Sequence, residues 1–168
     1  EEFLPERMKL ALTAPDAALK PGQDFSVDVQ GDYLYGAPAA GNRLLSNVVA
    51  RRERVALPQQ WPGFIFGDFA DDVTLKRVNL PDAEMDEQGH ASLDVDLAEL
   101  TGGAKSPMRV SVVASLLESG GRPVVRSLQR TLWPAVKMIG LRPLFDGEVA
   151  RVGAPAGFEI IRVDAQGK

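Results

Sequence analysis

Few residues of this chain belong to the types that perform acid–base or nucleophilic chemistry. It has 168 residues, no cysteine and a single histidine, His90. His90 follows the turn glycine Gly89, so we expect it at the solvated start of a strand. Ser92 would lie on the same strand face, but no third group completes a triad and no Gly-x-Ser-x-Gly motif occurs. One imidazole without thiolates does not build a metal site, so these residues predict neither a hydrolase nor a zinc centre.

Two acidic groups are candidates for other chemistry. The stretch 82–87 resembles the start of a calcium loop, but Glu87 and Leu93 occupy the positions that require glycine and a bidentate glutamate. Asp94 and Asp96 are spaced like paired carboxylates, yet such pairs on an exposed strand face are far more often solubilising. We therefore predict an acidic turn and a solvated strand face.

Basic and glycine-rich stretches are equally weak as sites. Arg51, Arg52 and Arg54 could bind an anion, but Glu53 lies among them, which favours a solvated strand end. The stretch 102–106 contains two glycines, a lysine and a serine, but it lacks the glycine spacing of a phosphate-binding loop and precedes a proline and a strand. We predict no catalytic residues, no cofactor, no metal and no enzymatic activity.

Composition excludes further classes of function. The formal net charge is -4, with 19 basic against 23 acidic residues, so no basic footprint exists for nucleic acid. No apolar run approaches the roughly 20 residues of a membrane span, so we expect no direct membrane insertion. The chain begins with Glu1 rather than methionine, which indicates a piece of a longer protein whose export signal would lie upstream.

The elements that would position these side chains are strands. Apolar and polar residues alternate in most of the chain, and no segment shows a helical period with caps, so we expect at most one helical turn near 97–100. The turn signals at 86–89 and 119–122 indicate tight hairpins. The fold class is therefore all-β, with antiparallel strands expected at 8–12, 25–29, 44–55, 91–97, 108–116, 124–133, 136–141 and 158–161.

A shaped corner lies between the second and third of these strands. Tyr33 and Tyr35 are two residues apart and should project from one face. Gly36, Pro38 and Gly41 then prevent the strand from continuing. We interpret this corner as the crossover of an antiparallel sandwich, with no ligand.

Four aromatic residues crowd into one irregular stretch, 58–72. Trp61, Phe64, Phe66 and Phe69 show no clean period there. One interpretation is an exposed anchor for a partner, because aromatic residues dominate interface energetics. The other, which we favour, is a long loop that folds back to cap the core.

Four stretches together resemble the macroglobulin-like domains of bacterial alpha-2-macroglobulins. They are residues 5–10, 19–22, 33–42 and 139–147, and the third carries a Tyr-x-Tyr-Gly-x-Pro element that is also similar to macroglobulin domains of vertebrate proteins. The resemblance covers essentially the whole chain. It implies a seven-stranded fibronectin/immunoglobulin-like β-sandwich.

The same resemblance implies how the chain divides. Residues 6–133 would form one macroglobulin-like domain, and 134–168 would be the incomplete N-terminal part of a second. The natural place for extra residues in the first is 58–72. Since two strands do not close a sandwich, the tail should pack on the first domain, pair between chains or be mobile. A position in the middle of the parent protein, before its bait region, is expected.

The function implied by the resemblance is that of a structural scaffold module in a broad-spectrum, protease-trapping endopeptidase inhibitor. In that family a bait region is cleaved and a conformational change captures the protease, in many members through a Cys-Gln thioester. The thioester cannot lie here, because the chain has no cysteine. Partners would be neighbouring macroglobulin domains and, through the full-length protein, proteases. The fragment alone should not inhibit.

The parent is expected in the periplasm, anchored to the inner membrane as a lipoprotein, in a role of bacterial defence. The alternative hypothesis is a free-standing adhesive or carbohydrate-binding β-sandwich, in which the aromatic loop 61–69 would be the stacking platform.

Overall fold

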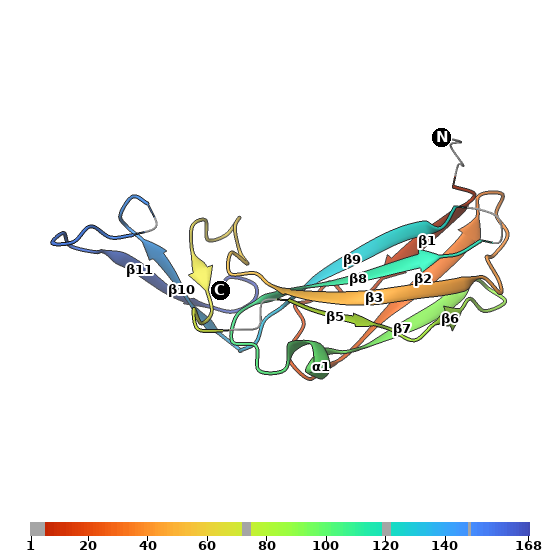
Figure 1. The fold of residues 1–168 in the computed structure, drawn as a ribbon, viewed down its shortest axis with the longest axis horizontal. Coiled ribbons are helices and arrows are strands. Elements are labelled where there is room, and N and C mark those ends of the chain that lie inside the picture. The colour runs from red at the N-terminus through yellow and green to blue at the C-terminus, as the bar shows by residue number, and fades with distance from the viewer. Residues whose placement is uncertain (1–5, 72–74, 119–121, 148) are drawn as a thin grey trace.

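The computed structural model describes residues 6–71, 75–118, 122–147 and 149–168. The molecule is elongated, with a large two-layered sandwich at one end and a small separate sheet at the other (Figure 1). The start of β1 lies at the end of the sandwich farthest from the small sheet. The predicted hairpin turn at 119–122 and the end of the stretch 58–72 reach residues outside the described ranges.

Among the described residues, one layer of the sandwich has three strands and the other has four longer strands plus one of two residues. The predicted antiparallel sandwich is confirmed, with one short strand more than the seven expected. The first layer has the order β1 (Met8–Thr13), β2 (Asp24–Tyr33), β7 (His90–Asp96). The second layer has the order β5 (Leu75–Asn79), β3 (Arg43–Arg52), β8 (Met108–Leu116), β9 (Val124–Leu132), with the two-residue β6 (Ala83–Glu84) also paired to β3.

Alternation in the sequence produces the core. In β2, Phe25, Val27 and Val29 are buried while the residues between them face solvent. The register sets Val27 opposite Leu93 of β7, so the apolar faces of neighbouring strands coincide. The same holds for the β8–β9 hairpin. The predicted strands thus point their apolar side chains into one continuous cluster between the layers.

The described residues contain a single helical turn, α1 (Leu97–Thr101), where at most one was predicted. Asp96 caps it, because its carboxylate accepts from the Ala98 and Glu99 N–H groups at 2.8 and 3.0 Å. Leu97 and Leu100 face the core. Across the described ranges, no helix combines the length and hydropathy needed to cross a bilayer.

The small sheet joins distant parts of the chain. Its order is β11 (Phe158–Val163), β10 (Met138–Pro143), β4 (Ile65–Phe66). β4 comes from the aromatic stretch between β3 and β5, so the C-terminal strands pack on the earlier part of the chain. One face of the sheet covers a second, separate apolar cluster. On the opposite face Ile139, Phe158 and Ile160 are exposed.

Some predicted boundaries were wrong. The third strand ends at Arg52 rather than at 55, because the chain turns there toward the small sheet. The strand expected at 136–141 runs from Met138 to Pro143. Strands β4, β5 and β6 were not predicted, because each is short and lies at a sheet edge or is exposed on both faces.

Candidate functional site

The residues with catalytic potential follow one another along the solvent-exposed face of β7. His90 is the exposed first residue of β7, and Ser92 is also exposed. Asp94 faces solvent, while Asp96 serves as the helix cap described above. Among the described residues, no group of three or more His, Asp or Glu side chains has an arrangement that could hold a metal ion.

The acidic turn at 82–87 is held by its own carboxylate. Asp86 accepts from the His90 and Gln88 N–H groups at 2.8 and 2.9 Å. These bonds, chiefly the one from His90, hold the pKa of the Asp86 carboxyl below its usual value. The Asp86 carbonyl also accepts from the N–H of Gly89, at 3.0 Å. A turn is present at 86–89, with Asp86 as a structural acceptor, but the predicted hairpin is wrong, because β6 pairs with β3 and β7 pairs with β2.

The tyrosine corner connects the two layers of the sandwich. The rings of Tyr33 and Tyr35 stack with centroids 5.2 Å apart. Tyr33 is half-buried beside Asn42, whereas Tyr35 is 79 % exposed. Gly36 and Gly41 both have positive φ angles, as the bends require. The Leu34 N–H donates to the Arg7 carbonyl at 2.9 Å, which places the corner beside the start of β1.

The aromatic stretch forms the centre of a joint between the sandwich and the small sheet. We name residues 61–71 the joint segment. Within it, Phe64 and Phe66 are buried, Trp61 is half-buried and Phe69 is 64 % exposed. Phe66 pairs with Gly140 of β10, and its ring lies 5.3 Å from that of Trp133. The second apolar cluster comprises Leu57, Phe64, Phe66, Trp133, Met138 and Val163.

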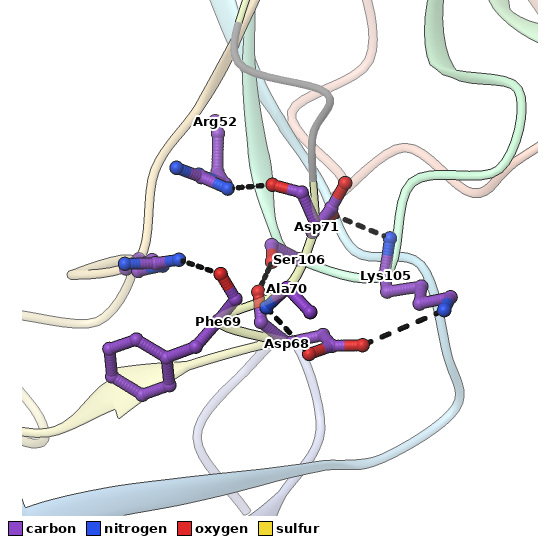
Figure 2. Close-up of polar contacts among 8 residues, drawn as sticks. Arg52, Asp68, Phe69, Ala70, Asp71, Lys105 and Ser106 are labelled. Atoms are coloured by element: carbon purple, nitrogen blue, oxygen red, sulfur yellow. Dashed lines mark hydrogen bonds and ion pairs between the residues drawn. The ribbon is translucent and has the colours of Figure 1, made fainter.

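Two arginines at the end of β3 hold the second half of the joint segment. The Arg52 guanidinium donates to the Asp71 carbonyl (Figure 2). Arg54 donates to the Phe69 carbonyl at 3.1 Å and lies over the Phe69 ring, 4.3 Å from its centroid. The prediction of a solvated strand end is therefore right for the exposed Arg51 and wrong for Arg52 and Arg54, which meet acceptors across the chain.

The loop before β8 contacts the same part of the joint segment. The Lys105 N–H donates to the buried Asp71 carboxylate at 2.9 Å, and the Lys105 ammonium lies 3.6 Å from the Asp68 carboxylate (Figure 2). Ser106, which is fully buried, donates to the Asp68 carbonyl at 3.3 Å. The stretch 102–106 is thus an anchoring loop.

The small sheet contributes its own polar contacts. Arg142 of β10 donates to the Glu159 carboxylate of β11 and to the Pro62 carbonyl, at 2.6 and 3.2 Å. Its guanidinium also lies 4.8 Å from the centre of the Phe64 ring. Trp61 donates its indole N–H to the Gly167 carbonyl at 2.9 Å. Backbone pairing, apolar packing and cationic contacts therefore meet in one place.

The sequence singled out the aromatic residues but not what surrounds them. Arg142, Trp133 and Gly140 complete the joint, and they lie about 70 residues later in the chain. One signal was available, since Gly140 lies inside the predicted strand 136–141 and a strand glycine often marks a close approach of another backbone or ring. Whether the four aromatic residues of the prediction contact a partner stays a prediction.

Comparison with known proteins identifies the fold. The model of the bacterial alpha-2-macroglobulin MG5 domain matches residues 6–134. The chain belongs to the bacterial alpha-2-macroglobulin family. The resemblance noted in the sequence is confirmed, and the match gives the domain a number that the sequence alone did not. The proposed limits of two domains, 6–133 and 134–168, stay a prediction.

Relatives extend the similarity over the whole chain. An alpha-2-macroglobulin from Xylella fastidiosa is 43 % identical over 169 residues, which cover 100 % of this chain and 10 % of the relative. The chain therefore spans about a tenth of the length of the curated alpha-2-macroglobulins it matches.

Two solved structures of Escherichia coli alpha-2-macroglobulin show the same fold. The native conformation, seen by cryo-electron microscopy, is 36 % identical with a TM-score of 0.83, covering 99 % of this chain and 11 % of that one. The trypsin-activated protein, seen in a crystal, is 36 % identical with a TM-score of 0.82, covering 98 % and 12 %.

Proposed function

We propose that this chain is a scaffold module of a bacterial alpha-2-macroglobulin that inhibits endopeptidases by trapping them, and that it has no enzymatic activity of its own. Two observations support the proposal together: the family match over residues 6–134, and a joint whose polar groups make structural contacts. Its charged groups hold backbone carbonyls and one another. A scaffold requires this arrangement, because its task is to set the positions of neighbouring domains.

The relatives supply the link to proteases. Structures of the Escherichia coli protein were obtained after activation by trypsin and by porcine elastase. Activation by two proteases with different side-chain preferences supports a broad target range for this family. The thioester found in many members of the family would have to lie outside these 168 residues, because they contain no cysteine.

Inhibition assays test the proposal. The 168-residue chain is mixed at equal molar ratio with trypsin or elastase, and cleavage of a large protein substrate is followed. We expect no protection by the chain, whereas the full-length parent should protect the substrate. Inhibition by the chain alone would show that it is more than a scaffold, and a parent without inhibitory activity would refute the proposal altogether.

The carbohydrate-binding alternative makes a different prediction. Tryptophan fluorescence would change on titration with glycans if Trp61 and its neighbours formed a stacking platform. We expect no response, because Phe64 and Phe66 are buried within the joint.

We also propose that the parent is a periplasmic lipoprotein of the inner membrane, as its family resemblance implies. Cell fractionation of the full-length protein tests this, and recovery from the cytosol would contradict it.

A further inference from the structure

The sandwich and the C-terminal hairpin (β10 and β11) are connected twice. The covalent connection runs from Leu132 at the end of β9 to Met138 at the start of β10. A single connection of this kind leaves a hinge, and relative motion between neighbouring units is the default unless their interface is large and apolar. The joint segment is the second connection, because it leaves the sandwich after β3, pairs with β10 and returns to the sandwich at β5.

Each half of the joint segment is held by a different body. The first half enters the small sheet, where Ile65 and Phe66 pair with β10 and Phe66 is only 1 % exposed. The approach is close enough that a Cβ added to Gly140 would lie 2.6 Å from the Phe66 ring. The second half is held by Arg52, the last residue of β3, and by Arg54, two residues beyond it; their acceptors are the backbone carbonyls of Asp71 and Phe69.

The chain is tightly packed at Gly67, where the two halves of the joint segment meet. Gly67 has a positive φ of 96°, and a Cβ added there would lie 2.3 Å from the Ser106 hydroxyl. The Phe66 N–H donates to the Arg54 carbonyl at 2.9 Å, so the strand that pairs with the small sheet is also bonded to the chain two residues beyond the end of β3. A rotation of the hairpin about its covalent link would have to break this bond or the β4–β10 pairing.

We propose that the joint segment makes the sandwich and the C-terminal hairpin a single rigid body, which keeps its shape when the surrounding protein changes conformation. The rigidity depends on this chain alone. Its persistence during a conformational change rests on the proposed function. Such a joint would keep the chain that follows β11 in a fixed orientation relative to the sandwich while the parent is activated. The hinges that move during activation would then lie outside this module.

The native and the trypsin-activated Escherichia coli structures align with 99 % and 98 % of this chain, the C-terminal hairpin included, with TM-scores of 0.83 and 0.82. The relative therefore offers both states in which the placement of the hairpin on the sandwich can be measured.

Distance measurement by electron paramagnetic resonance tests the rigidity directly. The chain has no cysteine, so the exposed pair Ser127→Cys on β9 and Arg162→Cys on β11 can be spin-labelled without background. We expect one narrow distance distribution. A broad or bimodal distribution would overturn the rigid joint.

A matched pair of variants identifies the cause of the rigidity. Phe66→Ala removes a buried ring of the joint, and Phe69→Ala removes an exposed ring of the same segment. In hydrogen exchange, Phe66→Ala should make the β10 and β11 amides exchange about a hundredfold faster. Phe69→Ala should leave them unchanged, and both variants should keep the protection of β8. If the two variants changed exchange in β10 and β11 equally, the buried Phe66 ring would not be the cause of the rigidity.

Should Phe66→Ala unfold the whole chain, Arg142→Gln offers a milder test. It removes the guanidinium that joins Glu159, Pro62 and Phe64 while leaving the cluster in place. It should broaden the spin-label distance distribution, and an unchanged distribution would show that this contact does not stiffen the joint.

The same label pair, placed at the corresponding sites of the full-length parent, tests persistence. We expect one distance before and after trypsin treatment. A changed distance in a parent that still traps trypsin would overturn the inference and leave the proposed function intact. A parent that neither traps nor responds to trypsin would instead refute the proposed function.

Discussion

Gly67 occupies a position that only glycine fits, for two separate reasons. Its φ of 96° disfavours any side chain, and Ser106 leaves no space for a Cβ. Gly36 in the tyrosine corner has almost the same φ, 98°, but nothing lies within 4 Å of its Cβ position. Comparison of the two therefore separates backbone strain from steric exclusion.

We predict that Gly67→Ala lowers the free energy of unfolding by about 1–3 kcal/mol more than Gly36→Ala, because the added methyl meets the buried Ser106. Urea titration of both variants measures the difference. Equal losses would mean that the loop before β8 moves away at no cost.

Asp86 is one of the carboxyl residues whose protonation should affect the fold. Hydrogen bonds from the His90 and Gln88 N–H groups lower its pKa in the folded state. A carboxyl with a lowered folded pKa stabilises the protein above its unfolded pKa of 3.8, and this contribution is lost as the pH falls through the folded pKa.

We predict that Asp86→Asn, which keeps an acceptor oxygen but does not titrate, makes the unfolding midpoint less sensitive to pH between pH 5 and about 3. Asp86→Ala, which loses the acceptor, should lower the midpoint at neutral pH. Thermal unfolding across this range measures both. A pH dependence in Asp86→Asn equal to that of the unchanged chain would assign the acid sensitivity to other carboxyls.

At the scale of elements, strands with a buried and an exposed face were predictable from sequence. The segment from Ala91 to Leu97 alternates cleanly, and its inward residues Leu93 and Val95 are buried. Where residues alternate in this way, local sequence and tertiary environment agree, so the individual strands and the β8–β9 hairpin were predictable. Which strands share a layer was not predicted.

The joint was not predictable, because its pairing is not local. β4 has two residues, too few to show a period, and its partner in β10 lies about 75 residues later. Arg52 and Arg54 look like surface charges until the loop that supplies their acceptors is placed beside them. The four aromatic residues indicated that the stretch was unusual without indicating what they would pack against.

The connection between β10 and β11 is the most exposed element near the joint. Its described residues, 144–147 and 149–157, are almost all exposed, and Val152 is entirely so. Among its described residues, the bond from the Leu144 N–H to the Gly157 carbonyl and the edge-on contact of the Phe145 and Phe158 rings close its base. An exposed loop with few backbone bonds to the body is a preferred site of proteolysis.

We predict that trypsin first cleaves this chain after Arg151, while Arg162 in the flanking strand β11 resists. Limited digestion followed by mass spectrometry identifies the first cut. The two pieces should stay together, because β10 and β11 remain paired. Arg151→Gln is the control and should delay the first cleavage, and an initial cut within either strand would contradict the structure.

The whole molecule has two apolar clusters, and its tryptophan side chains lie in or beside only one of them. The larger cluster fills the sandwich. The smaller one fills the joint, and both tryptophans of the chain, Trp61 and Trp133, belong to it or pack against it. Tryptophan fluorescence therefore reports on the joint, whereas far-ultraviolet circular dichroism reports mainly on the strands of the sandwich.

Because the two signals report on different parts, an unfolding experiment can test whether the sandwich and the C-terminal hairpin unfold together. If the joint makes one body of the chain, the fluorescence and circular dichroism transitions in urea should coincide. In Phe66→Ala, which loses a buried ring worth about 3–5 kcal/mol, the fluorescence transition should move to lower urea than the circular dichroism transition. In Phe69→Ala, whose ring is exposed, the two should still coincide. Separate transitions in the unaltered chain would mean that the hairpin unfolds independently of the sandwich, and the joint would then be a contact rather than a coupling.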